Sequence, residues 1–190
     1  MIVSCCILLF ANCFDSPTKK QSNKEVSDTA YIEQGQKIAM TTFATLSSNL
    51  QKAMKEGGVS EAVKYCNLAA SPLVDSLEQI YHAEIKRTSL KTRNPDNDPT
   101  EGERIQLEEY QQQVDAGKGL KPIVQKTSSQ TVFYAPISLM PLCEKCHGKL
   151  GEQLKIKDFE TIQELYPSDK AINYKSGDLR GMWSISFHEK

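Results

Sequence analysis

The sequence predicts an α+β fold, with helices in the first part of the chain and an antiparallel sheet in the second. Two observations carry this prediction. Apolar residues recur at helical spacing from Ala30 to Tyr81, and two extended segments flank the turn Thr127-Ser128-Ser129 as the strands of a hairpin do. The length of 190 residues fits one domain behind a leader, and a formal net charge of −1 without a basic stripe gives no indication of nucleic-acid binding.

The leader differs from the rest of the chain in composition. Ile2 to Ala11 form an apolar run that is too short to span a bilayer and long enough for the centre of a signal peptide. The run ends at Cys13 and resembles a lipoprotein attachment site, with Asn12 where Gly or Ala is more usual. We expect residues 1–12 to be a lipoprotein signal peptide and Cys13 to carry a lipid that anchors the chain to a membrane. An ordinary signal peptide is the alternative, and both predict an exported, periplasmic protein.

The segment that begins at Cys13 is polar, rich in Lys and Ser, and contains Pro17. Such a composition buries little apolar surface and favours extended, mobile chain. We therefore expect residues 13–29 to be a flexible tether and residues 30–190 to form the folded domain.

Each helix of the domain has a sequence signal at its end. Helical periodicity begins at Ala30 and stops at Gly57-Gly58. Ser60 is expected to cap a second helix, on which Cys66 points inward with small residues on its flanks. Ser71-Pro72 is expected to break that helix and open a third.

The second half predicts strands with helices between them. A capping-box pattern at Asp98–Glu101 opens the first of these helices, and glycines end it. The expected strands are Ala83–Leu90, Leu120–Lys126, Gln130–Ile137 and Met182–Phe187, and the expected helices are Pro99–Ala116 and Asp158–Leu165.

The most informative motif is Cys143-Glu144-Lys145-Cys146-His147, a C-x-x-C-H box. This spacing is the attachment signal of a c-type haem. Its two thiols add across the two vinyl groups of one porphyrin, and the adjacent His147 then reaches the iron as proximal ligand. The sequence therefore predicts one covalent haem c per chain, and with it redox chemistry or ligand sensing at iron.

Two other interpretations of the box are weaker. A thioredoxin-like dithiol needs a βαβ context, whereas Pro141 precedes this box and a Gly-rich segment follows it. A structural zinc site needs four ligands, and the chain has no second C-x-x-C and only His82 and His188 besides His147.

Four motifs occur along the chain, namely Arg87–Pro95, Cys143–Gly148, Tyr166–Ala171 and Gly177–Gly181. Together they resemble a family of exported haem-c domains of unknown function. The resemblance implies a fold similar to PAS sensor domains, in proteins that are free periplasmic cytochromes or the sensory ends of histidine kinases. In the family a Cys of the early helices is implicated as the second axial ligand, and Cys66 matches it, although Asn67 stands where Ser is usual.

Several residues compete for the distal position on the iron. Cys66 is the one cysteine of the mature chain without another role, and it lies on an inward helix face. Methionine is the usual partner in electron-carrying cytochromes c, which makes Met182 the main competitor. Met140 is too close to the box to reach the other side easily, and the remaining candidates are Met40, Met54, His82 and His188.

Three arginines are candidates to bind the haem propionates, because a guanidinium pairs with a carboxylate in bidentate geometry. They are Arg87, Arg93 and Arg180, and each could instead be a solvated surface residue. Asn94 and Pro95 are expected to fix a turn.

Two functions fit these residues. A thiolate distal ligand would lower the potential and suit a redox or gas sensor that signals through a protein partner, whereas a Met ligand would suit a membrane-tethered electron-transfer cytochrome. A haem enzyme is not expected, since no distal acid–base group is in view.

Overall fold

The structure is a computed structural model that describes residues 19–127 and 130–187. The predicted signal peptide, Cys13 and His188 lie outside these residues. Within them, no helix is long and apolar enough to cross a membrane.

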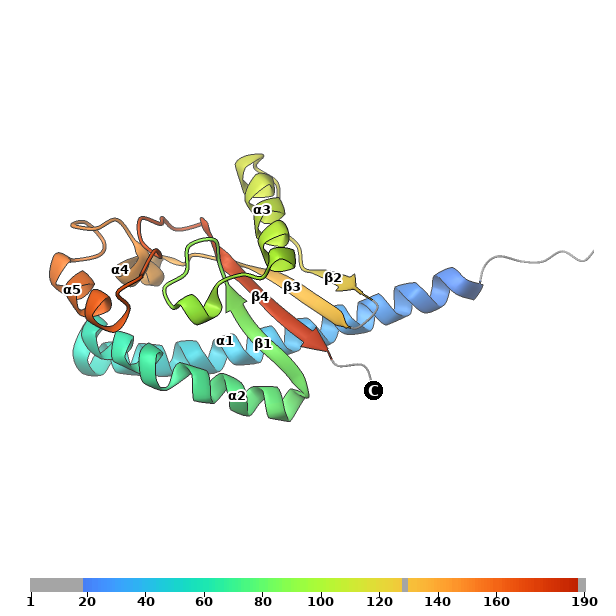
Figure 1. Cartoon of the computed structure of the whole chain (residues 1–190), viewed down its shortest axis with the longest axis horizontal. Helices are drawn as coiled ribbons and strands as arrows, with labels where there is room; N and C mark the ends of the chain where they lie inside the picture. The colour runs from blue at the N-terminus through green and yellow to red at the C-terminus, as the bar shows by residue number, and fades with distance from the viewer. Residues whose placement is uncertain (1–18, 128–129, 188–190) are drawn as a thin grey trace, which may run out of the picture.

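Four antiparallel strands form one sheet in the order β1-β4-β3-β2 (Figure 1). Each expected strand overlaps one of them, and the last begins earlier than predicted, at Leu179. Because β4 pairs on both sides, it is buried along most of its length. The strands are β1 Ala83–Thr88, β2 Ile123–Lys126, β3 Thr131–Ser138 and β4 Leu179–Phe187.

The helices complete an α+β fold, as the sequence predicted. Two of them, α1 and α2, precede the first strand in the sequence, and the others lie between successive strands. The helices are α1 Lys19–Leu68, α2 Ala70–Tyr81, α3 Glu101–Asp115, α4 Glu144–His147 and α5 Ile156–Leu165, with short 3-10 turns η1 at Pro95–Asn97 and η2 at Pro141–Cys143.

Helix α1 differs from expectation at its start and agrees at its interruption. It begins at Lys19, so residues 19–29, expected to belong to the tether, are helical. Lys, Gln and Glu are good helix formers, and extending an existing helix costs far less than nucleating one. The predicted break is present, since Gly57 and Gly58 depart from helical geometry, and Gly58 has φ 67° and ψ −152°, a conformation that essentially only glycine adopts.

The cap of α3 lies two residues later than the sequence pattern suggested. Thr100, rather than Asp98, is the N-cap, and its hydroxyl accepts from the backbone N–H of Glu103 while the Glu103 carboxylate accepts from the Thr100 N–H. The side chain of Asp98 instead accepts a hydrogen bond from Thr92. Asp98-x-x-Glu101 and Thr100-x-x-Glu103 both fit the capping-box pattern, so the local sequence did not distinguish them.

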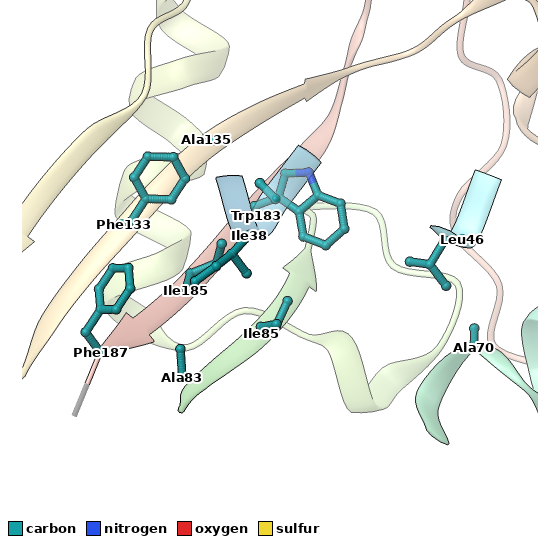
Figure 2. Close-up of a cluster of buried hydrophobic side chains, with 11 residues drawn as sticks. Ile38, Leu46, Ala70, Ala83, Ile85, Phe133, Ala135, Trp183, Ile185 and Phe187 are labelled. Carbon is teal, nitrogen blue, oxygen red and sulfur yellow. The ribbon is translucent and has the colours of Figure 1, made fainter. Parts of the chain in front are cut away.

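The two faces of the sheet carry different layers. Helices α1 and α2 cover one face, where the largest apolar cluster lies (Figures 1 and 2); its buried members include Ile38, Phe133, Trp183 and Ile185. Helix α1 approaches the sheet so closely that a Cβ on Gly35 would lie 2.2 Å from Cγ of Phe133. Helix α3 covers the other face.

Candidate functional site

A cavity of about 730 Å³ lies between α1, one end of the sheet and the C-x-x-C-H box. This volume is in the range of small-molecule and cofactor sites. Every described residue that the sequence predicted as part of the site lines it: Cys66, Arg87, Arg93, Cys143, Cys146, His147 and Arg180. The fold thus brings together residues from α1, β1, β4, α4 and the loops between them.

The box itself is compact. Pro141 opens the turn η2, and α4 follows directly, so Cys143 and Cys146 both line the cavity as free thiols. Gly148 ends α4, and a Cβ there would lie 2.5 Å from the Glu144 carbonyl oxygen, so no larger residue fits this turn.

The imidazole of His147 is held in one orientation. Its Nδ1 lies 2.7 Å from the carbonyl oxygen of Ala171. A carbonyl only accepts, so Nδ1 carries the proton and Nε2 keeps its lone pair for a metal. Burial, with Arg180 and Arg93 nearby, holds the pKa of His147 well below its usual range, so the ring stays neutral.

Arg93 joins the box to the segment that follows α5. Its Nη2 donates to the Cys146 carbonyl at 2.7 Å and lies 3.1 Å from Oδ2 of Asp169. Oδ1 of Asp169 accepts from the N–H of Ala171 at 2.8 Å. Arg93, which the sequence suggested as a propionate partner, therefore already supports the loop that orients His147.

Cys66 lies near the end of α1 and lines the same cavity. Burial raises the pKa of its thiol, while Arg87 and Arg93 oppose that rise. The pKa of Cys146 is raised to about 11, chiefly by burial, and a negative charge at Cys66 contributes to that rise because both sulfurs line the same cavity. Burial raises the pKa of the Tyr166 hydroxyl, and the neighbouring Asn67 side chain opposes that rise.

Arg180 reaches the cavity through an irregularity in β4. Ile137 pairs with Gly181 and Ser138 with Leu179, which leaves Arg180 as an extra residue. Its Nη1 donates to the Lys91 carbonyl at 3.3 Å, and its guanidinium lies 5.5 Å from the ring centroid of Tyr174.

Arg87 projects into the cavity from β1, with its guanidinium carbon 5.8 Å from the ring centroid of Trp183. Burial lowers the pKa of both Arg87 and Arg180. Within the described residues neither has an ion pair with a carboxylate, so the cavity wall carries two uncompensated positive charges.

Met182 is not a candidate ligand, which corrects one alternative from the sequence. It is fully buried on the α3 face, packed with Leu107 and Tyr110, because strand alternation turns it away from the face that Trp183 presents to the cavity. Met40, Met54 and Met140 do line the cavity, and His82 does not. The described residues contain no group of three or more His, Cys, Asp or Glu side chains placed to hold a metal ion together.

Sequence reasoning missed three contributors to the site. Asp169 belongs to a motif whose role was not assigned, Ala171 acts through its backbone carbonyl, and Tyr65 had no distinguishing signal. The hydroxyl of Tyr65 and the Nε–H of Arg93 are buried without a hydrogen-bond partner among the described residues, although both side chains line the cavity.

These observations fit a haem c. The cavity offers free thiols at the attachment spacing, an imidazole with an available Nε2, a thiol on another wall and two uncompensated arginines for the carboxylates of a porphyrin. The buried, unpartnered donors of Tyr65 and Arg93 point in the same direction, because buried polar groups are normally paired.

Comparison with known proteins gives a family and a related fold. The family model described as Tll0287-like matches residues 19–187. The crystal structure of the cyanobacterial heme-protein Tll0287 is similar with a TM-score of 0.58 at 22% identity, over 80% of this chain and 93% of that one. At this identity the likeness shows a shared fold. No curated protein gives a significant match.

Proposed function

Because the chain belongs to the Tll0287-like family, we propose that it is an exported c-type haem protein with one haem bound covalently through Cys143 and Cys146. The observation that carries the proposal is the convergence of the C-x-x-C-H box, Cys66 and the arginines on one cavity of about 730 Å³. The related fold belongs to a protein described as a heme-protein, which supports the same cofactor.

The residues of the chain take distinct roles in this proposal. Cys143 and Cys146 form the thioethers, and His147 offers Nε2 as the proximal ligand because Ala171 holds the proton on Nδ1. Cys66 offers its sulfur as the distal ligand. When bound, the haem iron supplies a one-electron redox couple and a site for small ligands.

In this proposal, Arg87 and Arg180 bind the negatively charged propionates of the haem. The guanidinium groups of the exposed Arg87 and the half-buried Arg180 line the cavity without carboxylate partners among the described residues, and the propionates of a haem would pair with them. The positive charge of the two arginines is thus opposite in sign to the negative charge of the propionates.

Between the two functional classes we favour a redox or gas sensor over a simple electron carrier. Methionine at the distal position is typical of carriers, and Met182, its best candidate, lies on the far face of the sheet. Met40, Met54 and Met140 line the cavity and keep the carrier as the alternative. A thiolate from Cys66 would stabilise ferric iron and would dissociate from the iron when the iron is reduced. This behaviour suits a PAS-like sensor that signals to a protein partner.

Export and membrane anchoring complete the proposal. Haem c is attached outside the cytoplasmic membrane, and the apolar run that ends at Cys13 supplies the route. A lipid on Cys13 would hold the domain at the periplasmic surface. Mass spectrometry of the mature N-terminus tests this, and an unmodified terminus beyond residue 13 would exclude the anchor.

Haem staining of the denatured protein tests the central proposal. In a host that matures c-type haem, the wild-type band should stain, because the thioethers survive denaturation. The Cys143→Ala/Cys146→Ala double variant should give a band without stain. An unstained wild-type band would overturn the proposal.

A further inference from the structure

Asp169 is a buried carboxylate that neither the box nor the haem requires directly. Its side chain has no exposed surface, and burying a charge is costly unless it is paired. It has two partners, the N–H of Ala171 at 2.8 Å and Nη2 of Arg93 at 3.1 Å. Because burying this charge costs free energy, we expect the contacts of Asp169 to indicate its role.

Both partners of Asp169 lead to the proximal side of the cavity. The first path runs through Ala171, whose own carbonyl accepts from Nδ1 of His147 at 2.7 Å. The second path runs through Arg93 to the carbonyl of Cys146 at 2.7 Å, and the same Nη2 lies 3.5 Å from the Ala171 carbonyl. Asp169 is thus linked to two adjacent residues of the box, to His147 by hydrogen bonds through Ala171 and to Cys146 through its ion pair with Arg93.

The geometry explains why a backbone acceptor needs such support. A carbonyl in a loop holds an imidazole only as firmly as the loop itself is held. Asp169 fixes the amide of Ala171, and Arg93 fixes the carbonyl side, so the acceptor of His147 is held from both directions. The strength of the Nδ1–H···O bond sets the basicity of a ligating histidine.

We propose that Asp169 is a positioning residue for His147, which acts through Ala171 and Arg93 to fix the tautomer and the electron donation of the proximal imidazole. The proposal rests on the proposed haem function. It differs from a purely structural ion pair, because it predicts an effect on the iron as well as on stability.

The test compares Asp169→Ala and Asp169→Asn with a matched control in the haem-loaded protein. Asp169→Ala removes both contacts, and Asp169→Asn keeps an acceptor for the Ala171 N–H while removing the charge that faces Arg93. The control is Glu103→Gln on the α3 side of the sheet, where a largely buried carboxylate also pairs, with Lys86 at 2.9 Å.

Asp169→Ala should raise the midpoint potential and lower the iron–histidine stretching frequency, and Asp169→Asn should do so less. Glu103→Gln should lower the melting temperature and leave both quantities unchanged. If Asp169→Ala lowers the melting temperature like the control but changes neither the potential nor the frequency, the proposal is wrong.

A second measurement separates this proposal from the haem proposal. Nitrogen NMR of the haem-free Cys143→Ala/Cys146→Ala chain should show His147 as the Nδ1–H tautomer, and adding Asp169→Ala should give a mixture of tautomers. An unchanged tautomer in a folded variant would overturn the role of Asp169 whether or not the wild type binds haem. Failure of haem staining with a normal tautomer response would overturn the cofactor instead.

Discussion

The two walls of the cavity that would face a haem are built in different ways. On the proximal side, hydrogen bonds from distant segments hold the box: the Tyr174 N–H donates to the His147 carbonyl at 2.9 Å, and the Asn173 N–H donates to Gly148 at 3.0 Å. The Ser176 N–H donates to the Glu144 carboxylate at 2.6 Å.

On the distal side, the stretch of α1 that carries Cys66 is held mainly by apolar packing. Cys66 lies on a helical stretch between the break at Gly57-Gly58 and the end of α1. This stretch packs through Val59 and Val63 against an apolar cluster that includes Ile162 of α5.

The difference indicates which of the two proposed ligands could move. Hydrogen bonds are directional and lose strength steeply with distortion, whereas apolar contact is non-directional and tolerates small rotations and shifts. His147 is therefore held in one orientation, whereas Cys66 lies on a helical stretch that follows the non-helical Gly57 and Gly58, where we expect a hinge. A sensor needs this asymmetry, because one ligand must leave while the other keeps the cofactor in place.

The largest expected effect comes from removing His147, the proposed proximal ligand. His147→Gly should abolish the low-spin ferric absorption spectrum of the attached haem, and added imidazole should restore it, because the space and the Ala171 acceptor remain. His82→Gly is the matched control. Its φ of 51° suits glycine and it lies outside the cavity lining, so its spectrum should equal that of the wild type. A low-spin spectrum in His147→Gly without imidazole would contradict the assignment.

A smaller effect is expected at the hinge. Gly58→Ala should cost about 1–3 kcal/mol of unfolding free energy, because its φ and ψ values are nearly inaccessible to other residues. It should also alter the ferric spectrum through the Cys66 side while leaving the His147 tautomer unchanged.

Gly102→Ala provides the control for the hinge variant. A Cβ there meets no atom within 4 Å, and the backbone is helical, so the unfolding free energy should change by no more than about 1 kcal/mol. Denaturant titration measures both variants. Equal stabilities would show that Gly58 is not conformationally required.

The sequence predicted the residues whose chemistry is local. The C-x-x-C-H box is recognisable from spacing alone, and an inward cysteine follows from helical periodicity. The α+β class and all four strands followed from patterning in the same way. The break at Gly57-Gly58 was predicted because glycine pairs end helices for a backbone reason that needs no tertiary context.

The remaining features depend on the assembled fold. Strand alternation shows that Met182 and Trp183 face opposite ways, but only the assembled sheet shows which of them faces the cavity. The acceptor of His147 is a backbone carbonyl, which has no sequence signature, and the role of Asp169 depends on a loop that returns to the box.

Electron paramagnetic resonance of the ferric protein tests the central claim most directly, namely that a fixed His147 and a movable Cys66 face one haem. The wild type should give the low-spin signal of thiolate ligation. Cys66→Ser should keep the covalent haem, lose that signal and raise the midpoint potential, since electron donation from sulfur is lost. An unchanged ferric signal in a folded Cys66→Ser variant would contradict the claim and give the distal role to another residue of the cavity.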